Sequence, residues 1–459
     1  MMKKRWLALI CLYLGGALFA NVASAEITSD YGGDFRLRQD YLEKIMDLKT
    51  MGKPDMDFFR LRSSLWGKVN LNENAGVYLK LTNEAKYYLG SYKPFETADS
   101  TTDSNRFDVD ELVIDNLYVH AKNIFGLPMD IRIGRQNFLG AYGEGFLILD
   151  GTPGDGSRTC YFNAVKATWR VNENHSVDVI YLSNPKTDDY LPSLYPARSN
   201  ALSAYDDNKR LLNASDETGV VVYGKSKINE HFLMEPYFIY KEEDPVRANP
   251  KLKLNTLGAR AVVTVGEWKV RGEFAHQFGE YENNRDRKSN GGYIFFGRKH
   301  EKVVLKPEWE VGYVYLSGDD PATSKHEGWD PLFSRAPMWN EIYAYLLLPE
   351  TLKDSGPIPS YWTNLHLYMA GIKLALTATT NFAASYQYLR SDQTTSGLSA
   401  AMFSNNSKER GHLATLLLSH GFTKQIDGLL QVEYFIPGKF YNDNAEHAAL
   451  YRWQLQYKF

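Results

Sequence analysis

The stretch "ALYRWQLQYKF" (residues 449–459) decides the fold, because large apolar residues take every second position from Tyr451 to Phe459. The positions between them carry Arg452, Gln454, Gln456 and Lys458. Side chains alternate between the two faces of a strand, so this pattern predicts a strand with one apolar and one polar face. Soluble sheets also contain such strands, so the fold class depends on whether the pattern recurs along the chain.

The first 25 residues, "MMKKRWLALICLYLGGALFANVASA", have the organisation of a secretory signal. A basic start is followed by an apolar stretch at residues 6–20 and by Ala23-Ser24-Ala25, which predicts cleavage before Glu26. A membrane anchor is the alternative, but the apolar stretch is short for a span. Cleavage would leave Cys160 as the single cysteine, which excludes an intramolecular disulfide and suits a bacterial envelope protein.

The composition leaves two classes of β-protein open. A net charge of -3 does not favour a nucleic-acid partner, and after residue 25 no run of eighteen apolar residues predicts a transmembrane helix. Aromatic residues make up 14% of the chain, yet its mean hydropathy is -0.41. A soluble β-protein fits these values, and so does an outer-membrane barrel with a polar lumen and aromatic girdles.

Alternating segments recur throughout the chain, and their connections fall into two length classes. The short connections, such as "NENA" (72–75) and "GE" (266–267), have the Asn, Asp and Gly content of hairpin turns. The long polar ones cover roughly 43–56, 92–108, 138–159, 184–215, 318–361 and 393–408. Tight turns at one end and long loops at the other are typical of an outer-membrane barrel, with periplasmic turns and extracellular loops.

The pattern predicts an all-β fold, a transmembrane antiparallel β-barrel of about eighteen strands formed by residues 26–459. The stretch "WNEIYAYLLL" (339–348) could be a further strand, but we assign it to the long loop because a single-chain barrel has an even number. The expected strands are 30–41, 57–71, 76–90, 111–122, 129–137, 161–171, 176–183, 217–227, 232–242, 255–265, 268–279, 291–299, 304–317, 363–376, 381–392, 409–422, 428–436 and 447–459.

Several stretches between residues 110 and 459 together resemble the alginate export family of bacterial outer-membrane barrels. They are "IRIGRQNFLGAYGEG" (131–145), "GDDP" with "WDPLFSRAPMWNEIY" (318–343), "RGHLATLLL" (410–418), "EYFIPGKFY" (433–441) and the closing "LYRWQLQYKF". The resemblance implies an eighteen-stranded monomer that passes a polysaccharide or another polar solute, without catalysis. This sequence departs from the family's arginine-rich funnel before "FIPG", where Gln431 and Glu433 face the expected lumen.

Period-two alternation places many basic residues on the face opposite the apolar one, where they are candidates for lining the pore and binding substrate. They are Arg60, Arg62, Lys68, Lys80, Arg132, Lys166, Arg170, Lys225, Arg260, Lys269 and Arg271. Such a wall could attract carboxylates or sulfates through its summed potential. The same face also carries acids, among them Glu84, Asp130, Glu235, Glu273, Glu308 and Glu310, so cross-strand pairing is the alternative interpretation.

Two features near residue 135 leave alternatives open. Arg135, a further candidate for lining the pore, falls on the lipid-facing parity of Ile131 and Ile133. It lies either at the strand end or behind a bulge at Gly134 that turns it inward. The loop "GAYGEGFLILDGTPGDGS" (140–157) is expected to fold into the pore, the alternative being an ordinary external loop. Its Asp150 and Asp155 are a weak signal for calcium.

Catalysis and cofactors are not predicted. The ten histidines are scattered without a zinc-binding spacing. A barrel phospholipase would need a serine beside a histidine on the outer wall, and His276 has the outward parity without an obvious serine on the same face. No metal or other cofactor is expected.

We therefore expect a monomeric outer-membrane channel that passes a polar, anionic, alginate-like oligo- or polysaccharide through a charged lumen. Its expected partners are outer-membrane lipid and lipopolysaccharide, the barrel-assembly machinery, and the solute itself. Transport would be facilitated diffusion, or export driven by a periplasmic synthesis complex. The alternative is a structural or receptor-like barrel that is sealed by its loops and binds a ligand outside the cell.

Overall fold

The computed structural model describes residues 27–49, 55–89, 107–150, 162–192, 194, 205–206, 209–210, 212–334, 340–355 and 362–459. The expected signal peptide, Cys160 and Asp155 lie outside these residues, as does the end of the loop 140–157.

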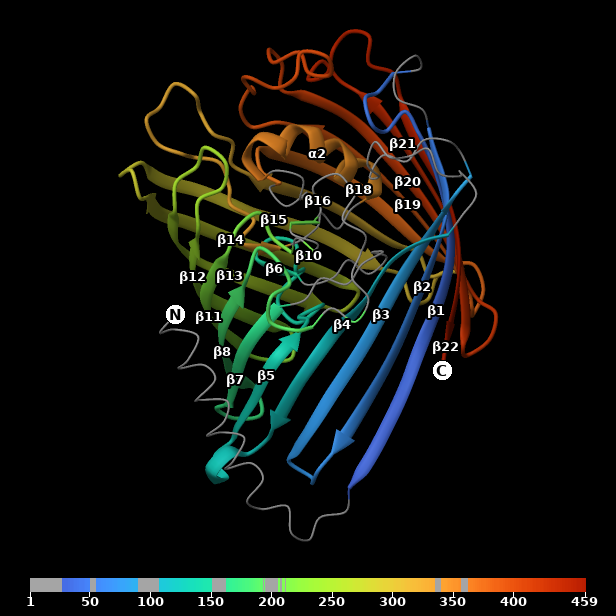
Figure 1. The fold of residues 1–459 in the computed structure, drawn as a ribbon. Coiled ribbons are helices and arrows are strands. Elements are labelled where there is room, and N and C mark those ends of the chain that lie inside the picture. Colours follow the sequence, from blue (N-terminus) through green and yellow to red (C-terminus); the bar gives the residue numbers. More distant parts are fainter. Residues whose placement is uncertain are drawn as a thin grey trace.

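Eighteen antiparallel strands form one closed sheet (Figure 1), and each expected strand coincides with one of them. The strands are β1 (Thr28–Glu43), β2 (Met56–Asn70), β3 (Ala75–Tyr88), β4 (Phe107–Ala121), β5 (Met129–Gln136), β7 (Phe162–Arg170), β8 (His175–Asn184), β11 (Glu217–Lys227), β12 (Phe232–Glu243), β13 (Leu252–Val265), β14 (Trp268–Tyr281), β15 (Asp286–Lys299), β16 (Glu308–Leu316), β18 (Leu365–Ala375), β19 (Thr380–Arg390), β20 (Glu409–Gly421), β21 (Ile426–Pro437) and β22 (Ala448–Lys458).

The remaining elements lie in the connections. Four strands of two residues are β6 (Leu149–Asp150), β9 (Tyr205–Asp206), β10 (Lys209–Arg210) and β17 (Phe333–Ser334). Among the described residues, a 3-10 turn, η1, spans Ile124–Gly126, and one helix, α2, spans Glu341–Ser355. The helix occupies the stretch at 341–348 that we assigned to a loop rather than to a strand, so the even strand count stands.

The last strand closes the barrel against the first. β22 pairs antiparallel with β1 from Asp34 opposite Lys458 to Glu43 opposite Ala449. Gly33 and Phe459 exchange two backbone hydrogen bonds, each 3.1 Å long. Because both edges of the sheet are paired, the barrel has no open edge to expose to lipid.

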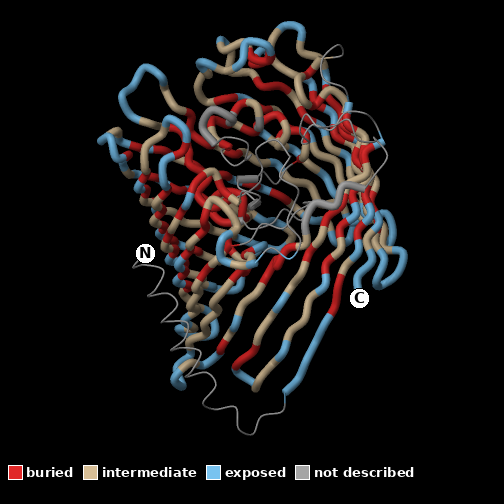
Figure 2. Tube along the Cα trace, in the orientation of Figure 1, coloured by how far each residue is buried: buried red, intermediate tan, exposed pale blue. Residues whose placement is uncertain are grey.

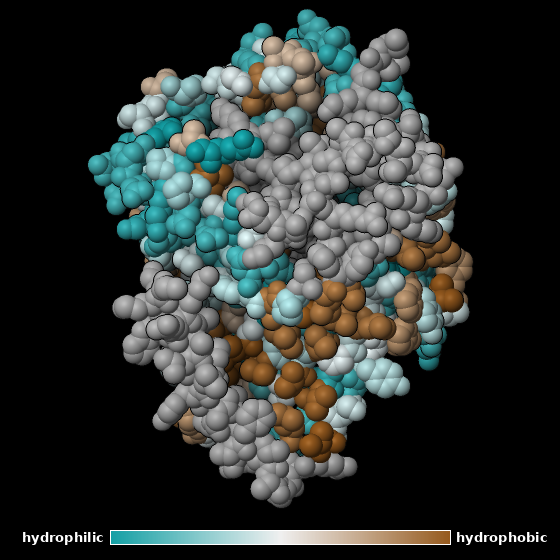
Figure 3. Space-filling model, viewed as in Figure 1, coloured by the Kyte–Doolittle hydropathy of each residue, from teal (hydrophilic) through white to brown (hydrophobic). Residues whose placement is uncertain are grey.

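Buried and exposed residues alternate along the strands, as the sequence pattern predicts (Figure 2), and the exposed positions are largely apolar. On β13 and β14, Leu257 and Phe274 are 61% and 57% exposed, whereas the intervening Thr256 and Gln277 are fully buried. Figure 3 shows apolar side chains gathered on the lower half of the wall that faces the viewer. Such a band is the surface that a barrel presents to lipid. No helix among the described residues is long and apolar enough to cross a membrane.

The inner wall differs from the expectation in its extracellular half, which is the upper half in Figure 1. There the wall is apolar rather than polar. Inward-facing positions near the extracellular ends of the strands are buried aliphatic residues that join one hydrophobic cluster, for example Ile180, Leu182, Val221, Ile239, Leu254, Leu365, Leu367 and Leu413. The cluster also contains residues of two extracellular loops and of α2. The barrel therefore encloses a hydrophobic core in its extracellular half, and a belt of charged residues on the inner wall lies below it.

Candidate functional site

The loop between β5 and β7 folds into the lumen, which confirms the expected inward fold for residues 140–149. Its Tyr142 hydroxyl donates a 2.8 Å hydrogen bond to Asp178 on β8. Burial and the neighbouring Asp178 raise the pKa of Tyr142, so the phenol stays protonated and can donate. Glu144 accepts hydrogen bonds from Arg260 at 3.3 Å and from Arg271 at 2.8 Å.

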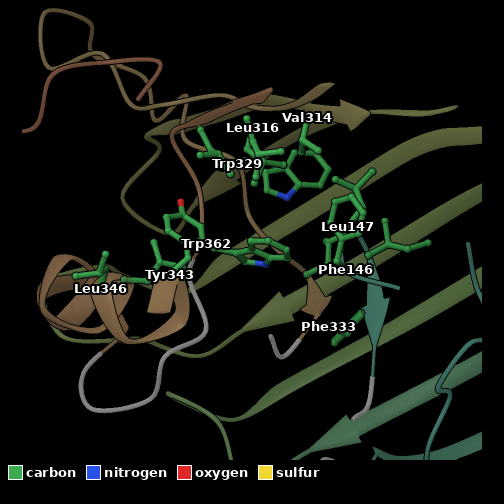
Figure 4. Close-up of a cluster of buried hydrophobic side chains, with 14 of the residues drawn as sticks. Phe146, Leu147, Val314, Leu316, Trp329, Phe333, Tyr343, Leu346 and Trp362 are labelled. Carbon is green, nitrogen blue, oxygen red and sulfur yellow. The ribbon is translucent and has the colours of Figure 1, made fainter. Parts of the chain in front are cut away.

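The loop between β16 and β18 meets this first loop inside the barrel. Phe333 donates its backbone N–H to Ile148 at 3.0 Å, and β17 pairs in parallel with β6. The rings of Phe146 and Trp362 lie 5.6 Å apart (Figure 4). We call the described residues 138–149, 329–334 and 340–347 the plug, since they form a single apolar unit with the upper inner wall.

Two glycines of the inner wall receive aromatic rings of the plug. A Cβ at Gly219 on β11 would lie 2.4 Å from the Phe333 ring, and one at Gly291 on β15 would lie 2.7 Å from the Trp329 ring. Real Cβ atoms do not approach so closely, so any side chain at either position would push the ring away. Glycines at inward-facing positions were the sequence signal that something packs against the wall inside the lumen. The alternation of apolar and polar residues does not reveal this signal.

Asp330 anchors the second loop to the wall. It is fully buried and lies 3.2 Å from Lys241 Nζ and 3.5 Å from Arg287 Nη1. Burial acts to raise the pKa of this carboxyl, but the two cations and the N–H of Leu332 outweigh burial and hold the pKa below its usual value. The loop is therefore fixed by a buried carboxylate as well as by apolar packing.

Helix α2 is held at both ends by side chains of the wall. The Glu433 carboxylate on β21 accepts hydrogen bonds from the N–H groups of Glu341 and Ile342, the latter at 2.9 Å. An anion at a helix N-terminus satisfies free N–H groups and the helix dipole. Toward the other end, Glu350 and Arg410 form two 2.6 Å hydrogen bonds. Glu433 faces the lumen as expected, and it serves as a support for the helix.

A basic cluster lies on the inner wall beside α2, where β22, β1 and β2 adjoin. It comprises Arg36, Arg38, Arg60, Arg62 and Arg452. The strand register sets Arg36 directly opposite Arg62 and Arg38 directly opposite Arg60. Sequence reasoning identified only the two arginines of β2. Alternation with the outward Phe35 and Leu37 was a local signal for Arg36 and Arg38, but only the strand register shows that they face Arg62 and Arg60.

Carboxylates lie both inside this cluster and on either side of it. Asp40 of β1 is inside it and pairs with Arg38 at 3.2 Å and with Arg452. Arg60 lies 3.1 Å from Glu84 and 3.6 Å from Asp40, and Glu341 of α2 lies 3.1 Å from Arg452. All five arginines are less than a tenth exposed. Like charges directly opposite each other on adjacent strands are destabilising. Asp40 offsets the repulsion between Arg38 and Arg60. Five arginines facing the three carboxylates of Asp40, Glu84 and Glu341 still give this part of the wall an excess of positive charge.

The other predicted cations of the lumen mostly have acidic neighbours, as the pairing interpretation expects. Lys80 lies 3.4 Å from Asp115, Lys166 lies 3.1 Å from Asp178, and Arg170 pairs with Asp130. Arg260 lies 2.6 Å from Glu235, and Arg271 lies 3.0 Å from Glu310. Arg132 instead lies over the Tyr118 ring, with its Cζ 4.5 Å from the ring centroid.

Arg135 occupies the extracellular end of β5, the first of its two expected alternatives. Gly134 before it has a φ of 128°, and Arg135 pairs with Leu117 in a continuous register. Its guanidinium donates to the carbonyl of Ile114 at 2.9 Å and to Asp188 in the next extracellular loop. Arg135 is 2% exposed. The structure thus uses it to join a loop to the barrel end.

The outer wall around His276 does not present a catalytic arrangement. His276 Nδ1 lies 2.9 Å from Asn290 Oδ1, and the ring stacks on Phe278. A serine would have to stand near this histidine to act as a nucleophile, and Phe278 occupies the next outward position. Within the described part of the chain, no group of three or more potential metal ligands is found.

Comparisons with known proteins agree with this architecture. A sequence model of the alginate export family matches residues 28–454. The fold is similar to the crystal structures of the outer membrane protein OpdK (TM-score 0.56, 12% identity) and of OccK8 (OprE; 0.54, 12%), both from Pseudomonas aeruginosa. It is also similar to OccAB2 of Acinetobacter baumannii (0.56, 10%). Each of these comparisons covers 94% of this chain and 98% of the other.

A comparison with curated proteins found no match. The family match spans nearly the whole chain, and the structural neighbours are outer-membrane barrels of the porin type. Together they place the protein in the outer membrane of a Gram-negative bacterium and indicate a transport channel rather than an enzyme. The chain belongs to the alginate export family of outer-membrane β-barrel proteins.

Proposed function

We propose that this protein is a channel for anionic polar solutes, with an alginate-like oligo- or polysaccharide as its substrate class. The observation that carries the proposal is the basic cluster, in which Arg36 faces Arg62 and Arg38 faces Arg60 across β1 and β2. A carboxylate of a passing uronate can accept paired hydrogen bonds from a guanidinium and add to the compensation that Asp40, Glu84 and Glu341 give these arginines.

The proposed mechanism is electrostatic selection in a constricted lumen. The potential of the cluster raises the local concentration of anions, and the neighbouring Glu341 keeps the attraction weak enough for release. The plug narrows the upper lumen, so a polymer would pass only when the plug residues move aside. A short oligosaccharide requires a smaller displacement and is the first ligand to test.

In this proposal the protein acts as a monomer that the barrel-assembly machinery inserts among outer-membrane lipids and lipopolysaccharide. Direction is not built into a passive pore, so export would need a periplasmic synthesis complex. The structural neighbour OpdK has been crystallised with vanillate, a small aromatic carboxylate. An aromatic acid therefore belongs in the test beside the uronates.

A second candidate function is a barrel sealed by its own loops that binds a ligand outside the cell. It is favoured by the apolar contacts inside the lumen, where Phe146 and Phe333 of the plug and the adjoining Trp362 bury their rings. The two functions differ in one observable property, because an open pore conducts ions and a sealed one does not.

The deciding measurement is the single-channel conductance of the refolded protein in a planar bilayer. Reversal potentials in a salt gradient give the ion selectivity, and trigalacturonate, polyuronate and vanillate serve as blockers. We expect anion selectivity and block by trigalacturonate. A conducting pore with cation selectivity would contradict the anion channel, and the absence of any conductance would support the sealed barrel.

A further inference from the structure

An aromatic strip lies on the inner wall near the periplasmic ends of β2, β3 and β4. The rings of Trp66 and Tyr78 are 6.0 Å apart with an interplanar angle of 21°, and those of Tyr78 and Tyr118 are 5.0 Å apart at 17°. The strip continues onto β5 through the guanidinium of Arg132, which lies over Tyr118. Four adjacent strands thus contribute one residue each to a continuous stack, in which Tyr118 lies between Tyr78 and Arg132.

The inward orientation of the strip follows from its neighbours along the strands. Leu65 and Leu79, beside Trp66 and Tyr78, are 52% and 38% exposed on the outer wall, so the rings point to the lumen. A Cβ at Gly32 on β1 would lie 2.7 Å from the Trp66 ring. The missing side chain at Gly32 therefore lets the indole approach the backbone of β1. None of the three rings is fully buried, so their surfaces remain partly accessible from the lumen.

Arg132 differs from the other candidate cations in its surroundings. Among the described residues no carboxylate lies within 4.0 Å of its guanidinium, which instead contacts the face of the Tyr118 ring. Lys166, in contrast, pairs with Asp178, and Asp130 pairs with Arg170. The guanidinium of Arg132 can therefore form a charge-assisted pair with an incoming anion without breaking an existing ion pair.

A cavity of about 150 Å³ adjoins this end of the strip. Its lining includes His120, Lys122, Asp130, Arg132 and Lys166. The Nδ1 atom of His120 is buried and has no hydrogen-bond partner among the described residues. A cavity with convergent polar groups beside an aromatic surface is the usual form of a small-molecule site.

We propose that the strip of Trp66, Tyr78 and Tyr118, together with Arg132, is a binding subsite at the periplasmic mouth for a ring that carries a carboxylate. The ring packs its apolar face against the lumen-facing edges of the stacked aromatic side chains, and its carboxylate pairs with Arg132. A hexuronate and an aromatic acid share this chemistry. The inference rests on the proposed channel function and assigns the position at which a solute would first bind from the periplasm.

Calorimetric titration of the refolded barrel tests the subsite directly, because binding is measured without any need for conduction. The ligands are galacturonate, galactose, benzoate and acetate, which separate the ring from the carboxylate. We expect galacturonate to bind more tightly than galactose or acetate. Binding of benzoate as tightly as galacturonate would identify an aromatic acid as the source of the ring, and weaker binding would identify a sugar acid.

Matched variants separate the two halves of the subsite. Tyr118→Leu removes the ring and should weaken galacturonate binding about tenfold, whereas Tyr118→Phe keeps the ring and should bind as the wild type does. Arg132→Gln should weaken it at least about tenfold. Arg298→Gln is the control, since it removes the same charge beside the outward Trp268 and should change nothing.

Two results would overturn the subsite. Wild-type affinity for galacturonate in both Tyr118→Leu and Arg132→Gln would do so, and so would the absence of binding by galacturonate and benzoate to the wild type. Reversal potentials of the same samples keep the two proposals apart. A failed subsite in a barrel that stays anion-selective leaves the channel proposal intact, because selectivity is assigned to the basic cluster.

Discussion

At the scale of single residues, alternation gave the direction of a side chain correctly but could not give its partner. Arg60 and Arg260 face the lumen as expected, and each lies beside carboxylates. Glu144, which contacts Arg260, is 116 residues away in a loop, and no local pattern relates the two. Arg38 has the inward direction that alternation with Leu37 indicates, but its position opposite Arg60 follows only from the pairing of β1 with β2. Partners on other strands depend on register and on loop conformation, which a single sequence does not display.

The double substitution Arg60→Ser with Arg62→Ser tests the basic cluster. Removing two of its charges should lower the preference for anions, which would appear as a reversal potential shifted toward zero in a salt gradient. We expect the wild-type reversal potential to fall by about half rather than to zero, since Arg36 and Arg38 remain on β1.

Arg298→Ser is the control, because it removes a positive charge from a position that pairs with Trp268 near the outer wall. Heat-modifiable migration on gels would show that each variant has folded. Unchanged ion selectivity in a folded double variant would show that this pair does not set the selectivity.

At the scale of elements, hydrophobic runs in loops were the hardest to interpret. The stretch "WNEIYAYLLL" was weighed as a strand or a loop, and its residues from Glu341 form α2. Short apolar runs do not distinguish a strand from a buried helix by periodicity. Asn340 was the local signal for a helix start, since its side chain accepts a 2.8 Å hydrogen bond from the Tyr343 N–H. The inward fold of residues 140–149 was predicted, but its contact with the second loop was not.

The attachment of the second loop should depend on pH through Asp330. The docked loop holds the pKa of this carboxyl below its ordinary value of 3.8, so the ionised form of Asp330 stabilises docking of the loop. That stabilisation is complete at pH values well above 3.8 and is lost as the pH falls through the lowered value. The protection factor of the Phe333 N–H, which bonds to Ile148, should therefore stay high at neutral pH and fall only in strong acid.

Asp330→Asn provides the corresponding variant at neutral pH. Removing one member of a buried charge cluster leaves Lys241 and Arg287 with less compensation and should weaken docking by about 3 kcal/mol. Asp320→Asn is the matched control in the same loop, because Asp320 bonds locally to the Ala322 N–H. Equal protection of Phe333 in the two variants would contradict the anchoring role of Asp330.

At the scale of the whole molecule, strand number and closure could be predicted. They follow from the alternation of apolar and polar residues, from the alternation of short and long connections, and from the even number of strands in a single-chain barrel. The hydrophobic core in the extracellular half of the lumen could not be predicted. Strand β18 is apolar on both faces there, with Leu367 buried and Tyr368 47% exposed. Alternation predicts that one apolar face of a strand meets lipid. It does not predict that loops folded inside the barrel cover a second apolar face.

Closure of the barrel should depend on the glycines at the junction of the first and last strands. A Cβ at Gly33 would lie 2.6 Å from the Ser64 carbonyl and 2.9 Å from the Phe459 ring. Gly33→Ala should therefore destabilise the barrel by about 1–3 kcal/mol and lower the temperature at which it loses heat-modifiable migration. Gly67→Ala is the control, since a Cβ there meets no atom within 4 Å. Equal midpoints for both variants would refute tight packing at the junction.

The contact between β6 and β17 has a consequence for the order of folding. It pairs Leu149 with Phe333, and several strands of the wall lie between these residues in the chain. Hairpins between neighbouring strands close short loops, whereas this pairing closes a very long one and gains its burial only from a wall that already surrounds it. Refolding should therefore proceed in two steps, with the strands assembling first and the tertiary contacts of the lumen forming later. A nascent barrel would pass through a stage at which it is closed as a cylinder and still unfilled.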